Sequence, residues 1–167
     1  MKTAFSYATS SLLLLMLAAS CHEKDSTPKS DFVVQATKDA TPWTAPSTAT
    51  YSKARKEFFV LGQAGDAAKA EVLALGFTLP AWPQPTPVQA LPASWRVLLG
   101  FDALTNSYAT ADATSLPKVE ITHLDTVSKV VEGRFQAILL REKQWTTKSE
   151  TMTLESGVFR AKYTVLP

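Results

Sequence analysis

The residue whose chemistry is easiest to specify is Cys21, because it is the only cysteine among the 167 residues. A lone thiol has no partner for an intrachain disulfide bond. It follows an uncharged apolar run, residues 12–19, and the small residue Ser20, while Lys2 places a positive charge near the N-terminus. This order is typical of an export signal, and the run is shorter than the about 20 apolar residues of a membrane-spanning helix. We therefore expect residues 1–20 to be a signal peptide.

A cysteine directly after small residues resembles the lipobox of bacterial lipoprotein signals. The resemblance implies that Cys21 takes a diacylglyceryl group, that the signal is cut before it, and that the new amine is acylated. Acylation would consume a thiol that is otherwise reactive in an oxidising compartment, and two or more acyl chains give stable membrane attachment. Simple secretion is the alternative, since Ala18 and Ser20 also satisfy the rule for ordinary signal cleavage. A retained membrane helix is a further alternative.

Residues 22–31, which read HEKDSTPKSD, are polar, charged and interrupted by Pro28. Such residues have no apolar surface to bury, so we expect 21–31 to comprise the lipidated cysteine and a disordered linker. Glu23 and Asp25 resemble the surface-export signals of lipoproteins from Bacteroidetes-type bacteria, although an ordinary solvated linker explains them equally well. The expected location is the outer membrane, on its periplasmic or its exposed side.

Other reactive side chains form no recognisable catalytic pattern. His22 and His123 are the only histidines, which excludes a His-rich zinc site, and we expect His123 to continue the face of Val119 and Ile121 at a strand end. No Gly-rich phosphate loop and no G-x-S-x-G elbow is present. We therefore predict no catalytic residue, metal or cofactor. Four carboxylates could pair in space for glycoside chemistry, but spacing alone assigns no pair: Asp112, Glu120, Asp125 and Glu132.

Three tryptophans are candidates for ligand binding. Trp43 lies beside Pro42, Trp82 lies within a proline-rich segment, and Trp95 follows that segment. An exposed platform of such rings would bind a sugar or a peptide. The alternative, which we favour, is that these rings fill the ends of the core, where large side chains contribute most. Trp145, in a charged segment, is expected to be more exposed.

The composition narrows the classes of partner. Lys and Arg number 17 against 15 Asp and Glu, and no basic stripe appears, so nucleic acid is not an expected partner. The chain after the signal is long enough for one core. Thr and Ser are plentiful while Gly numbers six, which suits strands. We expect one domain over residues 32–167.

Period-two alternation is the main structural signal. Residues 118–122 alternate polar and apolar side chains, residues 131–139 place their odd-numbered members on one face, and residues 159–163 do the same. Residues 67–77 fit a helix or a strand, and we favour a strand. Five prolines between residues 80 and 92 predict an extended loop without sheet ladders.

Shorter patterns complete this prediction. Turns are expected at 38–40 and 105–107, a buried strand at 58–61, and two final strands at 152–155 and 158–163. The predicted fold is therefore all-β, with roughly eight antiparallel strands in a single sandwich or closed barrel.

Three segments of the C-terminal half carry a family resemblance. Residues 119–125 read VEITHLD, residues 131–135 read VEGRF, and residues 154–159 read LESGVF. Their order resembles small Bacteroidetes-type lipoproteins with a domain of unknown function, whose pattern is roughly I-T-x-x-D, then G-x-F, then T-x-G-x-F. The region of Trp43 resembles their early x-W-x-A turn. The resemblance covers most of residues 32–163, implies an all-β fold and lends no established activity.

These observations lead to three functional hypotheses. The first is a non-catalytic envelope protein, attached to the membrane through acylated Cys21, that binds or scaffolds an envelope protein or a glycan. The second is a lipocalin-like carrier with an apolar ligand inside a barrel. The third is a hydrolase acting on glycans. An enclosed apolar cavity would favour the carrier, and converging carboxylates would favour the enzyme.

Overall fold

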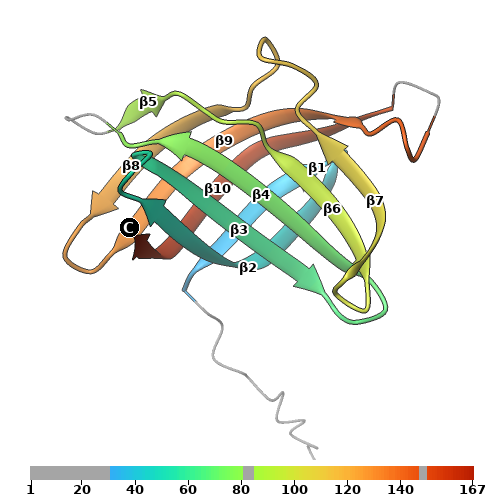
Figure 1. The fold of residues 1–167 in the computed structure, drawn as a ribbon, viewed down its shortest axis with the longest axis horizontal. Coiled ribbons are helices and arrows are strands. Elements are labelled where there is room, and N and C mark those ends of the chain that lie inside the picture. Colours follow the sequence, from blue (N-terminus) through green and yellow to red (C-terminus); the bar gives the residue numbers. More distant parts are fainter. Residues whose placement is uncertain (1–30, 81–84, 147–149) are drawn as a thin grey trace, which may run out of the picture.

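The computed structural model describes residues 31–80, 85–146 and 150–167, and within these ranges every regular element is a strand (Figure 1). This confirms the all-β prediction. Ten strands form one sheet. In chain order they are β1 (Val33–Lys38), β2 (Thr41–Ser52), β3 (Glu57–Gly65), β4 (Ala70–Thr78), β5 (Thr86–Val88), β6 (Ser94–Leu99), β7 (Ala103–Ala109), β8 (Lys118–Asp125), β9 (Val130–Arg141) and β10 (Thr151–Leu166).

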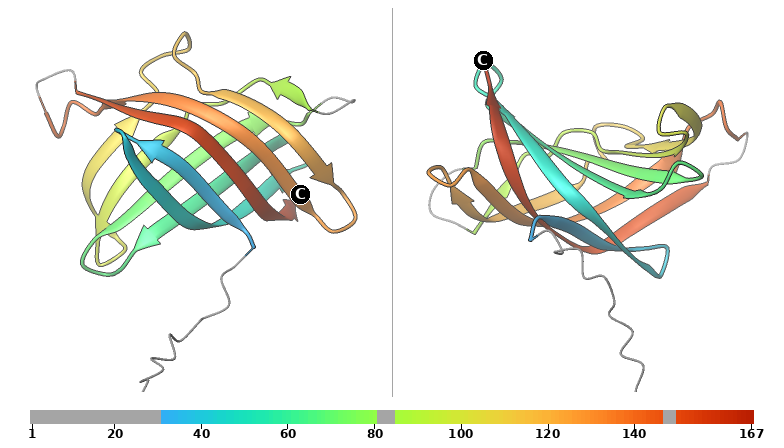
Figure 2. Two further views of the ribbon diagram at one scale, coloured as in Figure 1. Left: turned by 180° about the vertical axis from the view of Figure 1, so that it is seen from behind. Right: turned by 90° about the horizontal axis from the view of Figure 1, so that it is seen from below.

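The strands close into a ring. The order β10-β2-β3-β4-β6-β7-β9 returns to its start because β9 also pairs with β10. β1 pairs with both β10 and β2 along part of their length, and Figure 2 shows it beside these two strands. β8 adds to β9, and β5 adds to β8. All pairings are antiparallel except that of β10 with β2, which is parallel.

The structure corrects several local expectations. β5 lies within the proline-rich segment, where Pro87 pairs with Glu120, so this segment is not wholly loop; a strand that is only three residues long tolerates the missing N–H of proline. Residues 105–107 belong to β7 and are not a turn, because the chain reverses earlier, at Gly100 and Phe101, both with positive φ.

Of three other expectations, two are confirmed and one is wrong. β4 confirms a strand over residues 70–77 of the ambiguous segment, while residues 67–69 belong to the preceding loop. Asp39–Ala40 confirms the first turn, with positive φ at both residues as a type I′ hairpin requires. The final two strands are wrong as separate elements. They form one strand, β10, whose register shifts between Leu154 and Gly157 without ending the ladder. The total is ten rather than roughly eight.

Alternation decides which side chains fill the ring. The predicted inward faces of residues 131–139 and 159–163 are buried, with Val131, Leu139 and Ala161 fully so. Aromatic rings occupy much of the interior, where Phe58 stacks on Phe77 with ring centroids 5.4 Å apart. Burial of this apolar area is the main stabilising contribution of the domain. Further rings in this cluster are Tyr51, Phe135, Phe159 and Tyr163.

The two G-x-F motifs lie directly opposite one another on β9 and β10. Gly157 pairs with Phe135, and Phe159 pairs with Gly133, so each ring covers the glycine of the other strand. A methyl group added at Gly157 would lie 2.5 Å from the Phe135 ring. The motifs are therefore a reciprocal packing arrangement, in which each glycine leaves space for one aromatic ring.

Among the described residues, no helix has the length and apolar character needed to cross a membrane.

Candidate functional site: a groove on the outer face of β5, β8, β9 and β10

Two of the three candidate tryptophans lie inside the domain. Trp43 and Trp95 are 8% and 0% exposed, and their rings meet edge to face with centroids 4.6 Å apart. They form part of the core, so the exposed platform does not describe these two residues. Trp82 lies outside the described residues, and Trp145 is half-buried rather than exposed.

An ion pair between Lys38 and Glu71 lies against the indole ring of Trp95. Lys38 Nζ lies 4.7 Å from the Trp95 ring centroid and donates a hydrogen bond of 2.8 Å to Glu71 Oε1. Lys69 Nζ lies 3.2 Å from the same oxygen. The alternation of β1 and β4 turns Lys38 and Glu71 toward the interior at the end of each strand, where both are largely shielded from solvent. The arrangement joins a cation–π contact to a shielded ion pair.

Glu71 gives the domain an acid-sensitive contribution. Burial raises the pKa of its carboxyl, but the hydrogen bonds and charges of Lys38 and Lys69 outweigh burial and hold that pKa below its ordinary 4.5. A lowered pKa stabilises the fold above pH 4.5, and this stability is lost as pH falls through the lower, folded-state pKa.

We therefore expect Glu71→Gln to cost about 1 kcal/mol at pH 7, because the charge-assisted contacts of Lys38 and Lys69 with the carboxylate are weakened. The difference in unfolding free energy between wild type and variant should shrink as the pH falls below 4.5. Urea unfolding across this range measures it. Other carboxylates titrate in both proteins and cancel in the difference, so a difference that stays constant would contradict the assignment.

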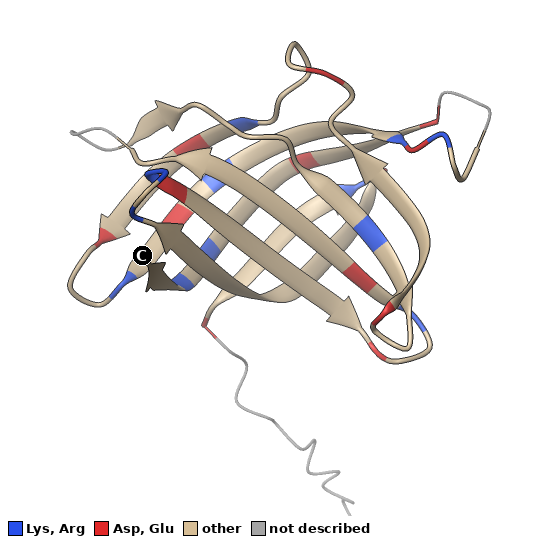
Figure 3. Cartoon of the chain, viewed as in Figure 1, with Lys and Arg blue, Asp and Glu red and all other residues tan. Residues whose placement is uncertain are grey.

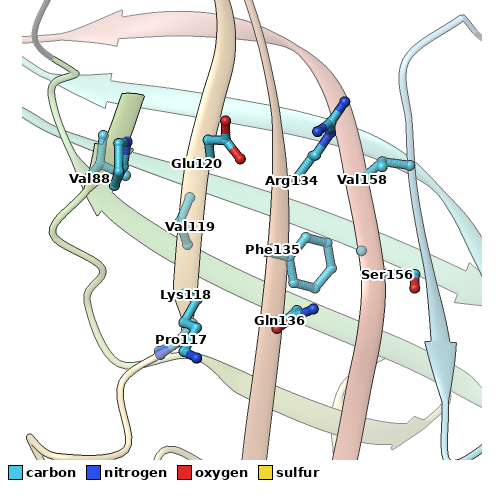
Figure 4. A pocket seen from close by; sticks show the side chains of 12 residues that line it. Val88, Pro117, Lys118, Val119, Glu120, Arg134, Phe135, Gln136, Ser156 and Val158 are labelled. Carbon is cyan, nitrogen blue, oxygen red and sulfur yellow. The ribbon is translucent and has the colours of Figure 1, made fainter. Parts of the chain in front are cut away.

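The outer face of β8, β9 and β10 carries a surface groove (Figure 4). Cross-strand register arranges its side chains in rows. Glu120 pairs with Arg134, and Arg134 pairs with Val158; in the next row, Lys118 pairs with Gln136. All five point outward because of strand alternation, and all but half-buried Glu120 are exposed.

A β-bulge in β10 shapes the groove. Leu154 pairs with Ala137 and Gly157 pairs with Phe135, so Glu155 and Ser156 together oppose a single residue of β9. Ser156 has a φ of 51°, a left-handed conformation that is uncommon for a serine. The bulge bends the strand at this row, which opens the surface between β9 and β10.

Two hollows meet at this bulge. One has a volume of about 770 Å³ and the other about 420 Å³, and they share Lys118, Gln136 and Ser156. Apolar walls come from β5 on one side, through Pro87 and Val88, and from β10 on the other. The combined groove is of the size that holds an extended polar ligand.

The charges of the groove are available for recognition. Among the described residues, Lys118, Glu120 and Arg134 make no ion pair. Two cations beside one carboxylate suit a ligand with at least one anionic group and several hydroxyl or amide groups. The guanidinium of Arg134 can bind a carboxylate or phosphate through a bidentate pair of hydrogen bonds. The hydroxyl of Ser156 has no hydrogen bond to a base in the described structure, so nothing there activates it as a nucleophile.

The carboxylates considered for glycoside chemistry do not converge. Asp112 and Asp125 cap turns: hydrogen bonds from Thr114 lower the pKa of Asp112, and a backbone hydrogen bond from Ser128 lowers that of Asp125. Glu132 lies 3.0 Å from Arg160, and only Glu120 faces the groove. Within the described ranges, no group of three His, Cys, Asp or Glu residues could hold a metal ion.

His123 corrects another expectation. It does not continue the face of Val119 and Ile121, because the register with β9 shifts between Ile121 and His123. The extra residue turns His123 outward, where it is exposed, and places Leu124 in the core instead.

The groove was not predicted from sequence. The predicted alternation of residues 131–139 leaves Arg134 and Gln136 on the face opposite the odd-numbered residues, but the bulge that makes this face concave has no sequence signal beyond Ser156-Gly157. Cys21 and His22 lie outside the described residues. No protein-family model, no curated protein and no solved structure matches this chain.

Proposed function

We propose that the chain is a lipid-anchored protein of the cell envelope that binds a polar partner, without catalysis, in the groove of β5, β8, β9 and β10. The groove carries this proposal, because it combines unpaired charges of both signs with apolar walls on a concave outer surface. The partner is an envelope protein or a glycan that bears an anionic group.

Membrane attachment is proposed through acylated Cys21. The sequence order of apolar run, small residues and single cysteine supports it, together with the resemblance to Bacteroidetes-type lipoproteins. Within the described residues, the strands lie between Val33 and Leu166, and we propose residues 21–31 as the linker between the anchor and this domain. The proposed location is the outer membrane.

The interior favours an outer-surface binder over the carrier. Phe58, Phe77 and Trp95 are 0–1% exposed and pack in one continuous cluster, whereas both hollows described above lie on the outer face. The dispersed carboxylates and the unassisted hydroxyl of Ser156 likewise give no support to a glycan hydrolase.

The anchor is tested with Cys21→Ser. In the native cell, wild-type protein should carry a diacylglyceryl group and an acylated amine on Cys21, and it should sediment with membranes. The variant has no thiol to alkylate, so we expect its loss from the membrane fraction to be nearly complete. Intact mass spectrometry reads the modification, and an unmodified cysteine in the wild-type protein would refute the anchor.

The groove is tested by photo-crosslinking in the intact envelope. A photoreactive residue in place of exposed Gln136, on the groove floor, should give one dominant adduct. The same replacement at exposed Gln63 of β3, outside the groove, is the matched control. The adduct should disappear when Lys118→Glu and Arg134→Glu reverse both cations. Equal adducts from both positions, or an adduct insensitive to charge reversal, would count against the groove.

A further inference from the structure

Exposed cationic side chains lie together at one end of the closed sheet. The β2–β3 turn, residues 53–56, reads KARK, and its Lys53, Arg55 and Lys56 are all exposed. Lys129 in the β8–β9 turn and Lys162 near the end of β10 lie at the same end. Among the described residues, none of these five cations makes an ion pair.

Contacts hold these segments together. The N–H of Lys53 donates to the carbonyl of Leu166 (3.2 Å), and the N–H of Tyr163 donates to the carbonyl of Lys129 (2.8 Å). The C-terminal strand therefore joins the β2–β3 turn to the β8–β9 turn. Figure 3 shows several blue segments near the C-terminus. The strands that meet here also carry two carboxylates that make no ion pair in the described structure, Glu57 at the start of β3 and Asp125 at the end of β8. Cations outnumber carboxylate side chains here.

Exposed aliphatic side chains lie between the cations. Val127, in the β8–β9 turn, is 90% exposed, and Leu166 is 46% exposed. Leu79, 41% exposed, follows β4 and donates its N–H to the carbonyl of Lys56 (2.7 Å). Cations interleaved with aliphatic side chains are the composition that binds the headgroup region of an anionic bilayer.

The N-terminal end of β1 faces the same side. β10 runs toward this basic end, and β1 is antiparallel to it, so Val33 lies nearer to that end than Lys38 does. Val33 pairs with Arg160, six residues before Leu166, which at about 3.3 Å per residue is about 20 Å along the strand. The eleven residues from Cys21 to Asp31 span at most about 40 Å.

We propose that this basic end docks on the surface of a bilayer containing anionic phospholipid, and so sets the orientation of the anchored domain. The inference rests on the proposed membrane anchor, which would place this end near the bilayer. Its test does not depend on the anchor. Docking here would leave the groove rows, which begin at Lys118 at the far end of β8, directed away from the bilayer and open to a partner.

The test uses residues 22–167, which retain every strand of the fold and lack both the apolar leader and Cys21. The chain is sedimented with vesicles of phosphatidylcholine, or of phosphatidylcholine and phosphatidylglycerol in equal parts. We expect binding only to the anionic vesicles, and its loss at high salt, where screening shortens the Debye length to about 3 Å at 1 M. Binding to both kinds of vesicle alike would overturn the proposal.

The variant Lys53→Gln, Arg55→Gln, Lys56→Gln removes the three turn cations. Each cation near an anionic surface strengthens binding about fivefold, so the triple change should weaken partitioning about a hundredfold. Lys69→Gln, Arg96→Gln, Lys143→Gln removes the same charge from exposed sites outside both the basic end and the groove, and it should change partitioning far less. Equal losses in the two triples would show a net-charge effect only and overturn the proposal. Matching thermal unfolding curves confirm that both variants fold.

A soluble polyanion, polyglutamate, separates lipid docking from an acidic protein partner. Binding to polyglutamate without binding to the anionic vesicles would assign the basic end to such a partner and would overturn lipid docking. Failure of the anchor itself would appear separately, as an unmodified Cys21 in native protein.

Discussion

Gly133→Ala is expected to destabilise the domain by about 3 kcal/mol, the upper part of the range for an overpacked core. The added methyl would lie 2.6 Å from Phe159 Cζ and 2.6 Å from the backbone carbonyl oxygen of Glu120. A side chain can rotate away, but the carbonyl oxygen is held in the sheet, where β8 pairs with β9. Urea unfolding followed by circular dichroism measures the loss.

Gly157→Ala provides the matched comparison. The three atoms nearest to its added methyl all belong to the ring of Phe135, at 2.5–2.6 Å. We expect Phe135→Leu to restore part of the stability lost in Gly157→Ala, because a smaller side chain clears the methyl. Phe159→Leu should not rescue Gly133→Ala, since the Glu120 carbonyl remains in the way. Equal rescue in both pairs would contradict the reciprocal packing described here.

Trp95→Ala is expected to cost about 3–5 kcal/mol, the range for removing a fully buried large aromatic side chain. Trp95 has no exposed surface, and its loss removes both the edge-to-face contact with Trp43 and the ring beneath Lys38. The resulting cavity would also leave the Lys38–Glu71 ion pair without its apolar support. The unfolding free energy in urea is again the measurement.

Trp95→Phe separates ring packing from the indole N–H. Nε1 of Trp95 is buried and has no hydrogen-bond partner in the described structure, so its removal gives up no hydrogen bond. We expect Phe to retain more than half of the stability that Ala loses. A cost for Phe as large as that for Ala would mean that the indole nitrogen has a partner and that packing is not the main contribution of Trp95.

The all-β class and the inward faces of the long strands were predictable because alternation is local. Each strand side chain points opposite to its neighbour, so Val131 and Leu139 on β9, or Phe159 and Tyr163 on β10, share a face whatever they pair with. The same reasoning placed the first turn at Asp39–Ala40 and favoured a strand after residue 67. It failed where proline composition suggested only loop, because a short strand at the end of the pairing order tolerates Pro87.

The candidate groove could not be predicted in this way. Its rows depend on which residue of β8 faces which residue of β9, and its concavity depends on one extra residue in β10. Bulges at Ser156 and beside His123 arise from the competition between ladder hydrogen bonds and core packing over several strands. Nothing near Ser156 in the chain specifies that Lys118 will lie across from it.

The amino-acid sequence alone determined the apolar run that precedes a single cysteine, the polar composition of residues 22–31 and the alternation of the strands, since each is a property of neighbouring residues. Tertiary structure decided that Trp43 meets Trp95, that the two G-x-F motifs cover one another, and that unpaired cations gather at one end of a closed ring. These contacts join residues far apart in the chain, and their register follows from the summed packing of the whole sheet rather than from any local preference.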